Sequence, residues 1–196
     1  MQFIKNKYTK YTDEELMTKA AQGNGAAFEE LYTRYSGKLM SYFRRMLWSD
    51  KELAEDCLHK LFLKIIEKPE LFDTSRNFKT WIYSAAHNIC KNEYRRMDTH
   101  PNINNTQQPV MGEEALPPMQ ERTVDNQKFL HDLEEELETL GENHRTTFRL
   151  RYFEHLSLKE IAEVMECSEG TVKSRLYYSL KALADKLKPY KSLLKQ

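Results

Sequence analysis

Residues 156–183 read LSLKEIAEVMECSEGTVKSRLYYSLKAL, a stretch with the pattern of a helix-turn-helix. Ser157 and Glu160 have the spacing of a capping box, so a short helix is predicted to begin directly after Ser157. Ser168 can cap a second helix after a tight turn. At Glu166 this turn is expected to be left-handed, which costs a residue other than glycine about 1 kcal/mol. The apolar positions that helical spacing turns inward are Ile161, Ala162, Met165, Val172, Leu176 and Leu180.

The outer face of the second predicted helix combines hydrogen-bond donors, cations and flat rings. Such groups read base edges and hold phosphates when a helix lies in the major groove of DNA. The alternative is a plain helical hairpin whose basic face is solvated. The residues on this face are Lys173, Ser174, Arg175, Tyr177, Tyr178 and Lys181.

The charges of the chain are unevenly distributed, although the net charge of its 196 residues is zero. Residues 126–142 contain one lysine against six acidic residues, whereas residues 143–196 contain 11 basic against 6 acidic residues. The helix-turn-helix region therefore has a net charge of +5. A local positive field attracts nucleic acid even when the whole chain is neutral.

The composition is typical of a globular protein, because 40% hydrophobic residues can form sizeable cores. No apolar run approaches the ~20 residues of a membrane span, and the N-terminus lacks the apolar core of a signal peptide. A soluble, cytoplasmic protein without membrane insertion is therefore expected. Cys57, Cys90 and Cys167 have no CxxC spacing and are expected to be buried free thiols. The single His87–Cys90 pair does not predict a zinc site.

Several helices are predicted in the N-terminal half. Thr12 and Glu15 form another capping box, and the helix that they open should end near Gly23. A long core helix follows from Ala26, and a further helix over residues 53–66 stops before Pro69. The charged outer face of the helix over residues 53–66 is, on periodicity alone, typical of a solvated surface. Its predicted buried stripe is Leu53, Ala54, Cys57, Leu58, Leu61, Phe62, Ile65 and Ile66.

The helix predicted to begin at Phe78 has an unusual outer side. Cations, amides and aromatic rings occur there together, a mixture that holds backbone phosphate and stacks bases. The alternative is an ordinary exposed helix end, where arginines suit the helix dipole. The polar and cationic strip consists of Asn88, Lys91, Asn92, Arg95 and Arg96, with Tyr83, His87 and Tyr94 beside it.

Residues 99–125 have no helical periodicity and are rich in proline, asparagine, glutamine and acids, which predicts a flexible linker. From residue 126 an acidic amphipathic helix runs to Gly141, and another helix leads into the helix-turn-helix. The two-residue alternation of strands does not appear. The sequence therefore predicts an all-α protein with two helical domains, residues 1–98 and 126–196.

Two blocks of the sequence resemble the extracytoplasmic-function (ECF) sigma factors of bacterial RNA polymerase. The run over residues 137–183, and within it LSLKEIAEVMECSEGTVKSRL, is similar to region 4 of that family. The N-terminal half is similar to region 2 through the segments FEELYTRY, AEDCLHKLFLKI and FKTWIYSAAHNICKNEYRR. The blocks occur in the family's order and cover most of the chain, so the resemblance is specific.

The resemblance implies a sigma subunit that binds core RNA polymerase, recognises a minus-35 promoter element with region 4 and melts a minus-10 element with region 2. It also implies an anti-sigma factor as a partner. The implied minus-35 contacts are Thr171, Lys173, Ser174, Arg175, Tyr177 and Tyr178. The implied minus-10 contacts are a base-capturing loop of Asp73, Thr74, Ser75, Arg76 and Asn77, together with Trp81, Tyr83, Asn88, Lys91, Asn92, Arg95 and Arg96. The implied polymerase contacts are Asp56, His59, Lys60, Leu63 and Lys64.

Two other classes of protein compete with this interpretation. A transcriptional regulator whose N-terminal helices sense a ligand or dimerise would account for the C-terminal half, but not for the cationic strip after Phe78. An enzyme is disfavoured because the sequence contains no glycine-rich phosphate loop, no metal-ligand cluster and no nucleophile motif. No catalytic residue, cofactor or metal is therefore expected.

Overall fold

The computed structural model describes residues 7–48, 50–99 and 124–188. Every regular element within these ranges is helical, which confirms the all-α prediction. The chain divides into two compact units, Met1–Ala115 and Leu116–Gln196. The predicted linker over residues 99–125 lies almost entirely outside the described residues. Within those ranges, no helix combines the length and the apolar character that crossing a membrane requires.

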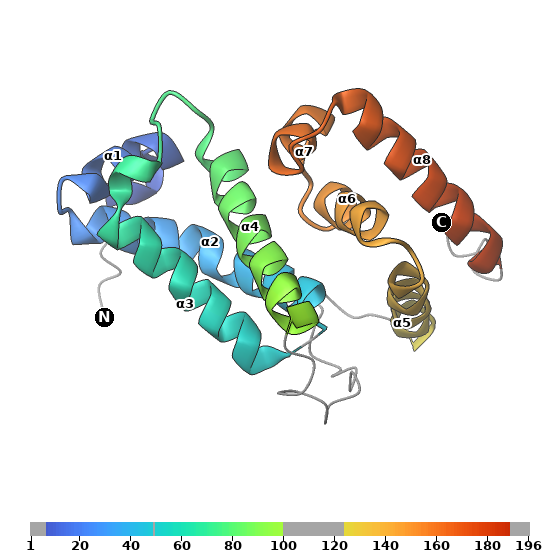
Figure 1. Ribbon diagram of the computed structural model, residues 1–196. Helices are drawn as coiled ribbons and strands as arrows, with labels where there is room; N and C mark the ends of the chain where they lie inside the picture. Colours follow the sequence, from blue (N-terminus) through green and yellow to red (C-terminus); the bar gives the residue numbers. More distant parts are fainter. Residues whose placement is uncertain (1–6, 49, 100–123, 189–196) are drawn as a thin grey trace. The chain divides into compact units, whose positions relative to one another are not determined.

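The first unit is built around three long helices and one short one (Figure 1). Thr12 and Glu15 form the predicted capping box, with the Glu15 amide 3.2 Å from Thr12 Oγ1 and the Thr12 amide 2.8 Å from Glu15 Oε2. Asn24 and Asp50 cap the next two helices through their side-chain oxygens. The elements are η1 (Lys7–Lys10), α1 (Asp13–Ala21), α2 (Gly25–Met46), α3 (Lys51–Glu67), η2 (Pro69–Leu71) and α4 (Phe78–Thr99).

The core of this unit is rich in aromatic rings that meet edge to face. The ring centroids of Tyr35 and Phe78 lie 5.4 Å apart, and those of Tyr42 and Tyr83 lie 5.6 Å apart. Helix α4 packs against α1, α2 and α3, so a wide arc of its circumference is buried. Six of the eight positions in the predicted stripe of α3 are buried, and Leu53 is half-buried. Ile66 is 57% exposed, so its inward assignment is wrong.

The N-terminus of α4 is fixed by α1. The Phe78 amide donates to Glu14 Oε1 at 2.9 Å, and the Thr80 amide donates to Asn77 Oδ1 at 2.9 Å. Helix α1 is in turn held to α2, because Arg34 lies 2.7 Å from Asp13 Oδ1. The loop that precedes α4 therefore ends at a rigid support.

The second unit contains the helix-turn-helix. Its core is formed by Leu133, Leu137, Phe148 and Leu183. Arg149 is 2% exposed, and its Nη2 lies 2.8 Å from carboxylate oxygens of both Glu134 and Glu138. This paired buried cation fastens the second helix of the unit to the first. The helices are α5 (Val124–Glu138), α6 (Glu142–Tyr152), α7 (Leu158–Val164) and α8 (Glu169–Lys186).

The helix-turn-helix has the local geometry that its sequence predicts. Ser157 and Glu160 form the capping box of α7, and Ser168 caps α8. Glu166 has φ +50°, the left-handed conformation expected in the turn. One predicted core position of α8 is wrong: Leu180 is 44% exposed, and the neighbouring Ser179 is fully buried instead. A serine fits there because its hydroxyl donates to the Arg175 carbonyl at 2.8 Å.

Candidate nucleic-acid interfaces

The exposed face of α8 carries most of the residues predicted for base and phosphate contacts. Val172 and Leu176 are buried against the rest of the unit, which turns the opposite face outward. Tyr177 and Tyr178 are 61% and 59% exposed, and their rings meet at a centroid distance of 5.4 Å. Lys173 and Ser174 are exposed between these rings and the N-terminus of the helix, whereas Thr171 is half-buried.

Thr171 and Arg175 have structural roles that the sequence pattern did not indicate. The Thr171 amide donates to Ser168 Oγ at 3.1 Å, and the two hydroxyl oxygens lie 2.9 Å apart, so Thr171 is part of the cap. Arg175 is half-buried, with Nη1 3.7 Å from Cys167 Sγ in the turn. Cys167 itself is half-buried, so the prediction of a fully buried thiol is wrong there, while Cys57 and Cys90 are buried as predicted.

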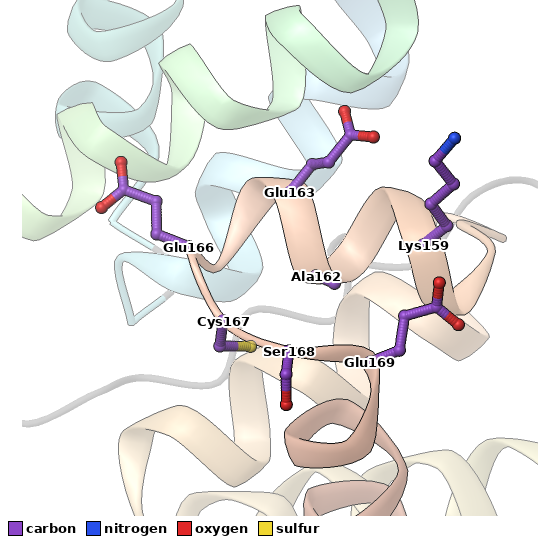
Figure 2. A pocket seen from close by; sticks show the side chains of 7 residues that line it. All are labelled: Lys159, Ala162, Glu163, Glu166, Cys167, Ser168 and Glu169. Carbon is purple, nitrogen blue, oxygen red and sulfur yellow. The ribbon is translucent and has the colours of Figure 1, made fainter.

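The turn between α7 and α8 forms an open depression (Figure 2). Its lining includes three carboxylates, Glu163, Glu166 and Glu169, against the one ammonium of Lys159. Three carboxylates repel a phosphate backbone, because like charges at short range are unfavourable. The depression is therefore unsuited to DNA, and the cationic and aromatic face of α8 is the better candidate.

The predicted strip on α4 is exposed at Asn88, Asn92, Arg95 and Arg96, and half-buried at Lys91. These positions follow helical spacing and share one side of α4. They combine three cations with two amides on one surface, as the sequence predicts. The strip can therefore hold phosphates and hydrogen-bond to base edges at the same time.

Two aromatic residues assigned to this strip or its border are buried, so these assignments are wrong. Tyr83 is 1% exposed and packs against Tyr42, which leaves no ring face for a base. His87 is 5% exposed, and burial together with the nearby Lys91 lowers its pKa to about 4. Tyr83 and His87 are buried because α4 packs against both α2 and α3, so a wide arc of its circumference faces the core.

A third aromatic residue beside the strip has an unpredicted neighbour. Tyr94 is half-buried, and its hydroxyl donates to the Met46 carbonyl at the end of α2. Its ring meets the ring of Trp48 at a centroid distance of 5.1 Å. Trp48 has φ +52° and is 41% exposed, features that sequence reasoning missed because nothing local to Trp48 indicates them.

The loop before α4 is exposed at all of its predicted positions, Asp73, Thr74, Ser75, Arg76 and Asn77. Asp73 Oδ1 accepts from the Ser75 amide at 2.9 Å and from Ser75 Oγ at 2.8 Å, and these bonds lower the Asp73 pKa. The side chain therefore stabilises the turn of the loop. Trp81 borders the loop half-buried, with its ring 5.2 Å from that of Phe72.

The outer face of α3 is exposed at the predicted positions Asp56, His59, Lys60, Leu63 and Lys64. Leu63 is 53% exposed, and Ile66 extends this apolar surface by one turn. An exposed face that mixes leucine and isoleucine with charges is typical of a protein interface.

One group of side chains on α5 has the composition of a metal site. Ligand atoms of His131, Asp132 and Glu135 lie within 4.8 Å of one another. The three residues are exposed or half-buried, and His131 Nε2 lies 3.6 Å from Glu135 Oε1. An i,i+4 pair on an acidic helix accounts for this arrangement without an ion.

Comparison with known proteins identifies the two units. The family description "Sigma-70 region 2" matches residues 31–99, and "Sigma-70, region 4" matches residues 130–183. The chain is 30% identical over 165 residues to the ECF RNA polymerase sigma factor SigL of Mycobacterium tuberculosis, with 84% of this chain and 90% of SigL covered. It is 29% identical over 187 residues to the RNA polymerase sigma-H factor of Pseudomonas aeruginosa, with 92% and 96% covered.

Two solved structures have a similar fold. CnrH in complex with the cytosolic domain of CnrY matches with a TM-score of 0.67 and 20% identity over 90% of this chain and 97% of that one. The sigma factor RpoE, in complex with the anti-sigma factor NepR from Bartonella quintana, matches with a TM-score of 0.64 and 22% identity over 82% and 98%.

The chain belongs to the ECF family of RNA polymerase sigma factors. Its function is to direct promoter recognition and transcription initiation with RNA polymerase. The resemblance inferred from the sequence is thereby confirmed, and the alternative of a ligand-sensing regulator is set aside. Sigma factors are initiation factors and not catalysts of RNA synthesis. The roles of individual residues and the domain boundaries remain predictions.

Proposed function

We propose that this sigma factor divides promoter recognition between three surfaces. The α8 face, defined as Thr171, Lys173, Ser174, Arg175, Tyr177 and Tyr178, reads the duplex minus-35 element. The α4 strip, defined as Asn88, Lys91, Asn92, Arg95 and Arg96, binds the opened minus-10 element together with Trp81 and the loop of residues 73–77. The α3 face, defined as Asp56, His59, Lys60, Leu63 and Lys64, binds core RNA polymerase.

The observation that carries the minus-35 assignment is the contrast between the turn of the helix-turn-helix and the α8 face beyond it. Three glutamates, Glu163, Glu166 and Glu169, line the depression at the turn, whereas Lys173 and the exposed Tyr177 and Tyr178 lie further along α8. Only this second group is attractive to a phosphate backbone. The guanidinium of Arg175 reaches from α8 to Cys167 in the turn, so Arg175 contributes from the edge of this face.

The minus-10 assignment is supported by the chemistry of the α4 strip and of the loop that precedes α4. The strip is a cationic helix side in the second half of α4, and Asp73 holds the exposed loop before the helix in a turn. Unstacking a base costs a few kcal/mol, so an opened strand needs a receiving surface. Cations and exposed amides suit single-stranded DNA.

The polymerase assignment is supported by the mixed character of the α3 face. Leu63 supplies apolar contact area, and four charged or titratable side chains surround it. Tethering to a large polymerase also raises the effective concentration of each DNA-binding unit at a promoter. We further propose that an anti-sigma factor covers these surfaces, that the chain acts in the cytoplasm, and that it supplies no catalytic group.

The decisive experiment adds the purified chain to core RNA polymerase and measures run-off transcription on a genomic promoter library. We expect specific products with both components and none with either alone. Binding of residues 1–98 to single-stranded minus-10 oligonucleotides then tests the α4 assignment against scrambled sequences. Equal affinity for both sequences would reduce the strip to a nonspecific basic surface. A chain that ignores polymerase and binds duplex DNA as a dimer would contradict the whole proposal.

A further inference from the structure

Trp48 is held in a backbone conformation that its side chain disfavours. It follows the end of α2 with φ +52°, a region where a bulky residue is a genuine outlier. The residue is also 41% exposed, so burial alone does not explain the choice of tryptophan. Strained residues persist where the surrounding structure holds them, and they cluster at functional sites.

The structure holds Trp48 against Tyr94, which lies beside the α4 strip. Its ring meets the ring of Tyr94 at 5.1 Å with an interplanar angle of 64°, and the Tyr94 hydroxyl is bonded to the Met46 carbonyl. Tyr94 lies three residues after Lys91 and directly before Arg95, so it borders the flank of the strip on which these two cations lie. An edge-to-face pair leaves ring surface uncovered.

The side chains around Trp48 and Tyr94, with Lys91 and Arg95, favour nucleic acid as the ligand. An indole offers a large face for stacking a base, and flanking cations can pair with the phosphates on either side of that base. The acidic side chains nearest along the chain are Asp50, whose Oδ1 accepts from the Leu53 amide as the cap of α3, and Glu93, which is buried and paired with Lys60 and Arg96. A cationic and aromatic surface of this kind is complementary to an anionic strand.

We infer that Trp48 is an additional DNA contact, which stacks on an unpaired base of the opened promoter strand beside the Lys91 and Arg95 flank of the α4 strip. This inference rests on the proposed role of that strip. Trp48 belongs to neither the predicted loop nor the predicted strip. It would extend the single-stranded interface from α4 onto the α2–α3 connection.

The test uses full-length chain saturated with core RNA polymerase and a fluorescein-labelled forked template, single-stranded at minus-10, taken from the most active library promoter. Trp48→Leu should weaken template binding about five- to a hundredfold, the range typical of one lost stacking contact. Trp48→Tyr should retain most of the affinity because it keeps a ring. Trp48→Gly, which adopts φ +52° without strain, provides a second ring-free variant if the leucine variant folds poorly.

The controls separate this inference from the proposed function. Tyr32→Leu removes an exposed ring from α2 and should leave template binding unchanged. Arg95→Ala should weaken binding if the α4 strip contacts DNA. Tryptophan emission quenched by template in the wild type, with the quench reduced in Trp48→Leu, would support direct contact.

Three outcomes would overturn the inference. If Trp48→Leu bound the template like the wild type while Arg95→Ala bound it more weakly, Trp48 would not be a DNA contact, although the α4 strip would be. If Trp48→Leu and Arg95→Ala both bound the template like the wild type, the proposed contact of the α4 strip with DNA would be contradicted as well. A loss of core polymerase affinity by Trp48→Leu, without any change in template binding at saturation, would assign Trp48 to a protein interface.

Discussion

Lys60 on α3 and Glu93 on α4 are joined by an ion pair, with Lys60 Nζ 3.3 Å from Glu93 Oε1. The other carboxylate oxygen of Glu93 lies 2.8 Å from Nε of Arg96. Glu93 is 8% exposed, whereas the side chains of its two partners are more than half exposed. One buried carboxylate therefore positions a cation of the proposed polymerase surface and a cation of the proposed DNA surface.

Glu93→Gln should release both cations. Because they are well solvated, the free energy of unfolding should fall by only about 1 kcal/mol. Promoter opening should weaken because Arg96 loses its fixed orientation, while binding to an isolated minus-35 duplex should not change. Permanganate footprinting of open complexes and chemical denaturation measure these effects.

Glu52→Gln is a matched control for this substitution, because Glu52 is exposed in the first turn of α3. It should leave promoter opening unchanged. If Glu93→Gln opened promoters as the wild type does, the ion pairs of Glu93 would be structural only.

Lys173→Ala should weaken minus-35 binding without altering the fold, because Lys173 is exposed and lies outside the buried stripe of Val172 and Leu176. Loss of one phosphate contact should flatten the slope of log affinity against log salt by ~1. Fluorescence anisotropy of a minus-35 duplex across a salt series measures this slope. Lys159→Ala, which removes an exposed lysine from the acidic depression at the turn, should leave the slope as it is.

Arg175→Ala should affect both stability and promoter binding, unlike Lys173→Ala. Its guanidinium lies 3.7 Å from Cys167 Sγ and is half-buried, so the alanine loses packing in the turn. We expect the free energy of unfolding to fall by about 1 kcal/mol and minus-35 affinity to fall by about 1–3 kcal/mol. Wild-type stability in the variant, measured by thermal unfolding, would contradict the packing role.

The predictions from sequence succeeded where a signal is local. The capping boxes at Thr12 and Ser157 and the left-handed Glu166 depend on residues within one turn of helix, so spacing alone identifies them. Helical periodicity likewise predicted the buried side of α8 at Val172 and Leu176. The exposed α3 face follows from the same spacing, whereas the base-capturing role of the loop before α4 was implied by the family resemblance.

The errors occurred where tertiary packing decides burial. Tyr83 is buried because α4 has neighbours on two sides, which one helix's periodicity does not show. At the edges of buried stripes, Ile66 and Leu180 are exposed although hydrophobicity favours burial. The contact between Trp48 and Tyr94 joins residues far apart in the chain, and the Lys60–Glu93 pair does the same. Such contacts need the packed structure.

The α3 face can be tested by charge reversal. Asp56→Lys combined with Lys64→Glu should impair binding to core RNA polymerase, because complementary charges across an interface become repulsive. The fold should persist, since both residues are exposed and the buried stripe of α3 is unchanged. Pull-down with core enzyme measures the loss. The double reversal Glu29→Lys with Lys38→Glu on α2 preserves the net charge in the same way and should bind normally.

Protonation of His87 should destabilise the first unit in acid. Burial, and secondarily Lys91, lower its pKa from 6.5 to about 4, so the folded state binds a proton less readily than the unfolded state. This penalty is absent above pH 6.5 and grows as the pH falls toward 4, where it reaches up to about 3 kcal/mol. Urea unfolding of the wild type and of His87→Leu between pH 7.5 and about 4.5 should show the free energy of unfolding of the wild type falling relative to that of the variant as the pH falls. Carboxylates titrate in both proteins, so this difference isolates His87, and His59→Gln, which changes an exposed histidine, should follow the wild-type curve. A constant difference between wild type and His87→Leu across that range would show that His87 titrates normally in the folded chain.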